Sequence, residues 1–284
     1  MPELPEVETI RRGLTKFIIG QTVTKIDVLC DKSYLGEPVK GRVEVIRRFG
    51  KALVIDLSGG YSLMIHLRMT GQLIYDGKGD RYAAGHPSEN FVATLPNKQT
   101  RVIIALENGT LYFNDQRKFG FVKAIKTSEV ESDAFIKKLA PEPWTMDPKV
   151  FHKKLQRHKL APVKATILDQ TIICGLGNIY ADEALFAAKI HPERKSGSIS
   201  EEEATKLLEC AKNVMETSIA SGGSTMATYV KADGTRGDYL DKFAQVFHRE
   251  GKPCPRCGEK IIKIRVAGRG THICPHCQQK EADA

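Results

Sequence analysis

The chain has 284 residues, a formal net charge of +9 and a pI near 9.1, with 41% hydrophobic and 27% charged residues. This composition is ordinary for a folded globular protein and excludes a disordered chain, while the length predicts two or three domains. No run approaches the roughly 18 apolar residues that a membrane span needs. The positive charge favours a polyanionic partner.

The localisation expected from these residues is cytoplasmic. Acidic side chains stand at the start of the chain, where a secretory signal would carry basic ones and then an apolar segment. Seven cysteines, an odd number, without an export signal favour a reducing compartment. We therefore expect a cytoplasmic protein with no membrane partner, and a monomer as the default state.

The chain opens with an amphipathic pattern that predicts a helix. Val7, Ile10, Leu14 and Phe17 fall at helical spacing, between Pro5 in the first turn and Gly20 at the end. Removal of Met1 would leave Pro2 as a secondary amine, and an α-amine (pKa about 7.7–8.0) is far more often neutral at pH 7 than lysine is. Such an amine can attack an electrophilic carbon. The ordinary alternative is a frayed, solvated terminus.

Residues 22–125 follow a β pattern. Seven short runs predict strands: Val23–Leu29, Val43–Arg47, Ala52–Leu57, Tyr61–Leu67, Arg101–Leu106, Thr110–Asn114 and Phe121–Ile125. Turn signals at 58–60 and 107–109 suit hairpins, so an antiparallel sandwich or barrel is expected. The stretch 76–100 is rich in Gly, Pro, Asn and charge, and it predicts a loop insertion.

The second half of the chain has a helical period. Helices are expected at 148–157, 162–170, 179–188 and 200–220, the last beginning with a capping box of Ser200 and Glu203. The domain boundary is placed near 125–150.

Four cysteines near the C-terminus form the strongest local motif. Cys254-x-x-Cys257 is followed after sixteen residues by Cys274-x-x-Cys277, the spacing of a four-cysteine zinc ribbon. Four protein ligands fill a tetrahedron, so one structural Zn²⁺ is expected, and no redox or nucleotide cofactor. Disulfides are the disfavoured alternative in a reducing compartment. The remaining cysteines, Cys30, Cys174 and Cys210, are interpreted as small buried apolar residues.

The segment around the cysteines concentrates the positive charge. Residues 249–280 hold eight Lys or Arg against two Glu. Between the cysteine pairs, Gly268-Arg269-Gly270 suits a hairpin tip whose guanidinium could bind phosphate. A solvated turn arginine explains this segment equally well.

Several motifs, in order along the chain, resemble one family. They are Pro2-Glu3-Leu4-Pro5-Glu6-Val7-Glu8-Thr9, Arg47-Arg48-Phe49-Gly50-Lys51, His66-Leu67-Arg68-Met69-Thr70-Gly71, Asp115-Gln116-Arg117-Lys118-Phe119-Gly120, Leu139-Ala140-Pro141-Glu142-Pro143, Gly175-Leu176-Gly177-Asn178-Ile179-Tyr180, Gly222-Gly223-Ser224-Thr225 and the zinc ribbon. The chain resembles the bacterial formamidopyrimidine-DNA glycosylases, which remove 8-oxoguanine and ring-opened purines and then cut the strand.

This resemblance implies an α+β multidomain fold. An N-terminal helix and antiparallel β-sandwich would occupy 1–130, with a linker at 131–145. A helical helix-two-turn-helix domain would occupy 146–240, including a lesion-recognition loop at 222–240, and a C-terminal four-cysteine zinc-finger hairpin would occupy 244–280. The partner implied is double-stranded DNA that contains an oxidised purine or an abasic site.

The resemblance also implies the site residues. The catalytic set would be Pro2 as nucleophile at the sugar C1′, Glu3 as general acid/base, Lys51 near the damaged site, and Arg269 on a phosphate. DNA-binding or supporting roles would fall to Glu6, Met69, Arg117, Phe119, Lys164, Asn178, Ser224 and Tyr229. An apolar plug and an arginine make sense where a flipped base leaves a gap.

Ordinary alternatives remain open for most of these residues. Lys51 could be a solvated β-edge lysine, while Met69 and Phe119 could belong to the core. Asn178 could bind a phosphate at a helix N-terminus or simply cap that helix.

The chain departs from the family pattern at Phe247-His248, at Gln116, at Arg101 and in the 76–97 insertion. None of these departures touches the proposed nucleophile.

Two other functions compete with this interpretation. One is the sister enzyme class that prefers oxidised pyrimidines, against which Leu4, Arg117 and Phe119 argue. The other is a zinc-ribbon protein that binds DNA without cutting it, which a retained Met1 would favour because the nitrogen of Pro2 would then be an amide.

Overall fold

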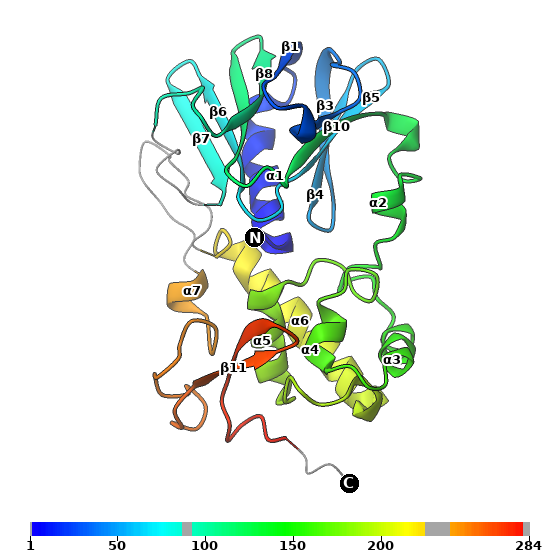
Figure 1. The fold of residues 1–284 in the computed structure, drawn as a ribbon, viewed down its shortest axis with the longest axis vertical. Coiled ribbons are helices and arrows are strands. Elements are labelled where there is room, and N and C mark those ends of the chain that lie inside the picture. The colour runs from blue at the N-terminus through cyan, green and yellow to red at the C-terminus, as the bar shows by residue number, and fades with distance from the viewer. Residues whose placement is uncertain (1, 87–92, 225–238, 281–284) are drawn as a thin grey trace. The chain divides into compact units, whose positions relative to one another are not determined.

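A computed structural model describes residues 2–86, 93–224 and 239–280 (Figure 1). These residues form two compact units. The first contains residues up to Lys137 together with the segment from Ser221, and the second contains Lys138–Ala220 together with the segment from Tyr239. The division after Lys137 lies inside the linker predicted at 131–145. Among the described residues, no helix is both long and apolar enough to cross a membrane.

The first unit is a helix packed on an antiparallel β-sandwich. Its elements are α1 (Leu4–Ile18), β1 (Thr22–Val28), η1 (Asp31–Ser33), β2 (Tyr34–Leu35), β3 (Gly41–Phe49), β4 (Ala52–Leu57), β5 (Tyr61–His66), β6 (Gly71–Gly77), β7 (Asp80–Gly85), β8 (Thr100–Leu106), β9 (Gly109–Asp115), β10 (Phe121–Lys126), η3 (Thr127–Glu129) and α2 (Ala134–Lys137). The strand order is β2-β10-β5-β4-β3-β1-β8-β9-β6-β7, and within the described residues of this unit only β2 and β10 pair in parallel.

Helix α1 is held by both layers of the sandwich (Figure 1). Of the four residues of its predicted apolar face, Val7, Ile10 and Leu14 are almost fully buried in the core made by the strands, and Phe17 is partly buried against that core. Burial of such a face, rather than helix propensity, supplies most of the stability of a helix of this length. The sandwich therefore fixes the helix whose first turn carries the predicted catalytic residues.

The prediction of a loop over 76–100 is wrong in part. Strand β6 runs to Gly77, and β7 pairs with it antiparallel as an edge strand. The side chain of Tyr82 on β7 packs against α1 at Gly13, where a Cβ atom would stand 2.2 Å from the tyrosine ring. Residues 80–85 contain no β-branched side chain, so local propensity gave no strand signal.

The second unit is helical and ends in a hairpin. Its elements are α3 (Pro148–Arg157), α4 (Val163–Ile167), α5 (Asn178–Ala188), η4 (Ser196–Ser198), α6 (Glu201–Ala220), α7 (Tyr239–Lys242), β11 (Ile262–Val266) and β12 (Arg269–Ile273). The predicted capping box of α6 is confirmed, since Ser200 N–H donates to Glu203 at 2.9 Å and Glu203 N–H donates to Ser200 Oγ at 3.1 Å. The short helix α7 was not predicted.

The cysteine-bearing segment packs against helix α5. Phe186 of that helix forms one buried cluster with Val246, Cys254, Ile261 and Cys274. The α+β fold class with a sandwich, a helical region and a four-cysteine hairpin is confirmed. Of the three remaining cysteines, Cys174 is buried as expected, whereas Cys30 and Cys210 are only partly buried.

Candidate active site and nucleic-acid interface

Pro2 is buried immediately before α1, and the two carboxylates that follow it close the first turn of that helix. Glu3 is the N-cap residue, and its side chain accepts from the backbone N–H of Glu6. In return Glu3 N–H donates to Glu6 Oε2 at 2.8 Å. The partial positive charge of the helix N-terminus stabilises both carboxylates. Glu3 and Glu6 are therefore fixed to each other in the helical turn that directly follows Pro2.

Glu6 also binds the start of the predicted lesion-recognition loop. Its Oε1 accepts from Ser224 N–H at 2.9 Å and from Ser224 Oγ at 3.0 Å. Gly223 has φ +90°, which favours glycine there, and a Cβ atom at this position would stand 3.5 Å from Glu6 Oε1. Ser224 is fully buried. The structure thus brings Ser224 to Glu6, while Tyr229 lies outside the described residues.

Lys51 lies in the turn between β3 and β4 and is only 6% exposed, so the alternative of a solvated edge lysine is wrong. The turn is held from α1. Arg48 donates to the carbonyl of Gly50 at 3.0 Å and to Glu8 Oε2 at 3.1 Å. Burial alone would raise the pKa of Glu8, but hydrogen bonds from Arg11, Arg12 and Arg48 lower the pKa to about 2. An ionised Glu8 therefore connects α1 to the Lys51 turn through Arg48.

His66 is a buried residue that the sequence analysis quoted inside a motif without giving it a role. Burial, and then the positive charges of Arg68 and Lys51, lower the pKa of His66 to about 3. Its Nδ1 accepts from Arg68 N–H at 3.0 Å, so the imidazole is neutral with its proton on Nε2. A neutral imidazole beside two cations offers a donor without adding charge.

The proposed gap-filling residues lie on two turns of the first unit. Met69 is 40% exposed and Phe119 is 57% exposed, so the alternative that they belong to the core is wrong. The guanidinium of Arg117 stands 4.9 Å from the centroid of the Phe119 ring, a cation–π contact. Exposed apolar side chains next to an arginine form a surface that could enter a base stack.

Both turns are held by a single buried carboxylate, that of Asp115. It accepts from the Thr70 hydroxyl, from Arg117 N–H at 3.1 Å and from Gly120 N–H at 2.7 Å. Its backbone carbonyl accepts from Arg101 Nε at 2.8 Å, which gives the unusual Arg101 a structural role. Sequence reasoning gave Asp115 no role, although it begins a quoted motif.

In the second unit, the Asn178 side chain contacts the backbone of the hairpin next to Arg269. Asn178 is the first residue of α5, whose N-cap is Gly177, so the alternative that Asn178 caps the helix is wrong. Its Nδ2 instead donates to the carbonyl of Gly270 at 3.0 Å. Arg269 begins β12 after the Ala267-Gly268 turn, and it is exposed. The predicted hairpin is confirmed.

Lys164 has partners within the protein. Its side chain is 1% exposed, and its Nζ lies 2.6 Å from Asp182 Oδ1. It also donates to the Thr271 hydroxyl at 2.7 Å and to the Gly270 carbonyl at 3.2 Å. A contact of Lys164 with DNA stays a prediction, which this set of partners does not by itself favour.

The four cysteines converge as a metal site requires. Their sulfur atoms all lie within 4.8 Å of one another, and the Cys254–Cys277 and Cys257–Cys274 pairs are 3.9 and 3.5 Å apart. Four thiolates at about 2.3 Å from one zinc ion would be about 3.8 Å apart. Backbone N–H groups of Arg256 and Cys277 lie 3.4 Å from Cys254 and Cys274 sulfur atoms and would stabilise thiolates. The residues present therefore fit one structural zinc ion.

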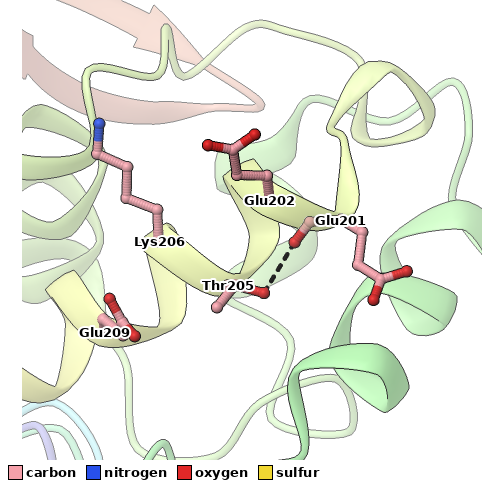
Figure 2. A pocket seen from close by; sticks show the side chains of 5 residues that line it. All are labelled: Glu201, Glu202, Thr205, Lys206 and Glu209. Atoms are coloured by element: carbon pink, nitrogen blue, oxygen red, sulfur yellow. Dashed lines mark hydrogen bonds between the residues drawn. The ribbon is translucent and has the colours of Figure 1, made fainter.

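A surface depression at the start of α6 is distinct from these groups (Figure 2). It is lined by Glu201, Glu202, Thr205, Lys206 and Glu209. Three carboxylates against one ammonium group make this surface unsuited to phosphate.

Comparisons with known proteins place this chain in a family. It matches the formamidopyrimidine-DNA glycosylase N-terminal domain over residues 1–122, the H2TH domain of the same enzymes over 139–230, and the zinc finger found in FPG and IleRS over 251–280. It is 40% identical to the formamidopyrimidine-DNA glycosylase of Pelotomaculum thermopropionicum, over 98% of this chain and 99% of that protein.

Solved structures agree with this match. Lactococcus lactis Fpg in complex with abasic-site DNA has a TM-score of 0.85 at 35% identity, covering 98% of this chain and all of that one. The wild-type L. lactis protein bound to DNA with an oxidised pyrimidine has a TM-score of 0.84 at the same identity and coverage. The chain belongs to the formamidopyrimidine-DNA glycosylase family.

Proposed function

We propose that this protein is a base-excision repair glycosylase and abasic-site lyase that works through the secondary amine of Pro2. The observation that supports this proposal is the setting of Pro2. Pro2 is buried directly before Glu3 and Glu6, whose carboxylates fix each other in the first turn of α1. Burial and a rigid helix end hold a nucleophile in one geometry, and such positioning is a large part of catalysis. The mechanism requires removal of Met1, which frees the amine.

The reaction begins at the sugar of the damaged nucleotide. The Pro2 nitrogen attacks C1′, the bond from C1′ to the base breaks, and the base leaves with a proton. The amine loses its own proton, the bond from C1′ to the ring oxygen O4′ breaks as O4′ takes up a proton, and the opened sugar is left as an iminium ion on Pro2. This cation acidifies the C2′ proton, whose removal expels the 3′ phosphate. A second elimination then expels the 5′ phosphate, and water releases the remnant from Pro2.

The neighbouring groups supply proton transfer and charge. We assign Glu3 the role of general acid and base, and such proton transfer typically raises the rate about 10²–10⁴-fold. Glu6 supports the terminus through Glu3 and Ser224. Lys51, next to a neutral His66, is suited to a phosphate or to the reacting sugar.

The remaining predicted residues would bind double-stranded DNA. We propose that Met69, Arg117 and Phe119 fill the gap left by the flipped nucleotide, and that Asn178 and Arg269 bind a phosphate of the damaged strand. For Tyr229, in the predicted lesion-recognition loop, we propose the DNA-binding role that the resemblance implies. A phosphate contact by Lys164 is the least supported of these assignments, because its side chain is buried and paired.

The proposed preferred substrate is an oxidised purine, by the same resemblance. The name shared by the relatives refers to formamidopyrimidines. Oxidised pyrimidines are the second candidate, because a related Fpg has been crystallised with DNA that contains one. We further propose that the protein acts as a cytoplasmic monomer.

One experiment tests this function. The protein is incubated with a duplex containing 8-oxoguanine opposite cytosine, and borohydride is added to reduce the iminium. A covalent protein–DNA adduct is expected, and it should vanish in a variant whose terminus is extended so that the Pro2 nitrogen is an amide. An adduct with an oxidised pyrimidine alone would select the second substrate class, and strand binding without any adduct would leave a DNA-binding protein.

A further inference from the structure

A buried lysine–carboxylate pair connects α4, α5 and the zinc-finger hairpin. Lys164 of α4 and Asp182 of α5 are each at most 1% exposed, with Nζ and Oδ1 2.6 Å apart. The other oxygen of Asp182 accepts from the backbone N–H of His272 on β12 at 2.9 Å. Burial removes the hydration of both charges, which costs free energy. The cost is offset only where the pair has good geometry and further hydrogen-bond partners.

The pair leads directly to the arginine at the hairpin tip. Lys164 Nζ donates to the Thr271 hydroxyl at 2.7 Å, and that hydroxyl donates onward to the backbone carbonyl of Arg269 at 3.1 Å. Thr271 is fully buried. We refer to Asp182, Lys164, Thr271 and Arg269 as the Lys164 contact chain.

The same contacts fix the backbone of the hairpin next to Arg269 relative to Asn178. The carbonyl of Gly270, the residue between Arg269 and Thr271, accepts from both Lys164 at 3.2 Å and Asn178 Nδ2 at 3.0 Å. Because one carbonyl receives both donors, the hairpin tip is fixed against the N-terminus of α5. That end of the helix carries a partial positive charge.

We infer that Lys164 and Asp182 are positioning residues, which set the exposed guanidinium of Arg269 beside the Asn178 end of α5 so that both can bind the same DNA phosphate. This inference rests on the proposed function for the phosphate roles of Asn178 and Arg269. It replaces a direct DNA contact by Lys164, because the amine already has three oxygen partners inside the protein.

The two roles of Lys164 predict opposite effects of the Asp182→Asn variant. If Lys164 bound DNA itself, removal of the competing carboxylate would free its charge and strengthen binding. If Lys164 acts through the contact chain, the same substitution loosens the hairpin tip and weakens binding. Lys164→Met weakens binding under both roles, so Asp182→Asn is the deciding variant.

Thr271 gives a gentler test because it carries no charge. Thr271→Val keeps the shape and removes the hydroxyl, whereas Thr271→Ser keeps the hydroxyl. Thr205→Val is the matched control, since Thr205 lies in the acidic depression on α6 and its hydroxyl bonds only locally, to the Glu201 carbonyl (Figure 2). Zinc content and the thermal midpoint of each variant show whether it is folded at the assay temperature.

The assay is equilibrium binding of the full-length protein to a duplex with a tetrahydrofuran abasic analogue, measured as a function of salt concentration. We expect Thr271→Val and Asp182→Asn to weaken binding about tenfold, as loss of a charge-assisted contact does. Each should also lower the salt slope by about 0.9, the loss of one phosphate contact. Thr271→Ser and Thr205→Val should bind like the parent protein.

A double-variant cycle completes the test. In an Arg269→Gln background, Thr271→Val should have almost no further effect, because the contact it positions is already gone. Tighter binding by Asp182→Asn, an unchanged salt slope in folded Thr271→Val, or additive effects with Arg269→Gln would each overturn the inference. Binding to the tetrahydrofuran site needs no catalysis. Absence of a borohydride adduct would therefore contradict the proposed function without changing the binding result.

Discussion

The two units hold their functional groups by different means. In the first unit, the carboxylates at the site accept hydrogen bonds largely from nearby backbone N–H groups, as Glu6 does from Glu3 and Asp115 does from Arg117 and Gly120. In the second unit, side chains from separate elements hold the hairpin, through the Lys164–Asp182 pair and the four cysteines.

This difference corresponds to two chemical tasks. A nucleophile and its acid–base partner need positions that are correct to a fraction of an ångström, and a helix N-terminus offers several fixed donors within one turn. A phosphate contact tolerates more variation but must be carried by an exposed tip, which a small hairpin can fix only through ligands and buried pairs. The two regions should therefore fail in different ways.

Removal of zinc should cause the largest effect and should be confined to the second unit. Structural zinc contributes roughly 10–16 kcal/mol to small finger elements, so chelation should unfold the segment that holds Arg269 and weaken DNA binding by at least about a hundredfold. Binding by fluorescence anisotropy before and after chelation measures this loss, and restored zinc should reverse it.

The matching control is the circular dichroism of the β-sandwich in the first unit. Its circular dichroism and its unfolding midpoint should survive chelation, since its core contains no cysteine ligand. Loss of the sandwich signal together with the finger would contradict the separation of the two regions.

Asp115→Asn should give the next largest effect, this time in the first unit. The Asn side chain would present an NH₂ group to a backbone N–H that needs an acceptor. Leaving that buried N–H without an acceptor costs about 3 kcal/mol of folding free energy. The turns that carry Met69, Arg117 and Phe119 would lose their fixed positions. Excision of an intact lesion should therefore fall more than cleavage at a preformed abasic site, which is easier to flip.

Single-turnover rates on the two substrates measure this difference, and Asp76→Asn is the control. Asp76 makes an exposed ion pair with Arg81 on the β6–β7 hairpin, so its loss should cost little. Equal loss of both rates in Asp115→Asn would show that the carboxylate matters for stability alone.

Sequence reasoning succeeded where function depends on residues close together in the chain. The capping box at Ser200 and Glu203, the zinc motif and the helix after Pro2 are each encoded within a few turns or by a fixed spacing. The resemblance added the order of motifs and hence the fold. No pattern of this kind identified β7, and the packing of its Tyr82 on Gly13 joins residues far apart in sequence.

The sequence could not predict which residues far apart in the chain contact each other in the fold. A lysine at position 164 looks the same whether it faces DNA or a buried aspartate, and only the fold brings Asp182 and Thr271 to it. His66 and Asp115 stood in quoted motifs, but their roles follow from burial and from bonds to Arg68, Thr70 and Gly120. Tertiary contacts decide the role of a polar residue more often than its neighbours in sequence do.

The smallest of the three predicted effects concerns Glu8, and it tests whether charge holds the first unit together. Glu8→Gln should lower the free energy of unfolding at pH 7 by about 2 kcal/mol, because three arginines lose their shared carboxylate, with a discount for partial solvent screening. Urea unfolding of the variant and the parent protein at several pH values measures the difference. Glu44→Gln, at an exposed position on β3, should change stability by no more than about 0.5 kcal/mol.

The pH dependence gives this prediction its sign. The pKa of Glu8 is lowered from 4.5 to about 2 in the folded protein, so its stabilising contribution is complete above pH 4.5 and disappears as the pH falls towards 2. The stability gap between parent and Glu8→Gln should therefore be constant from pH 7 to pH 5 and then narrow. A gap that stays constant down to the acid unfolding transition would mean that Glu8 acts through packing rather than charge. The connection from α1 through Arg48 to the Lys51 turn would then be steric. The forces that hold the functional groups within each unit would be more similar than their contacts suggest.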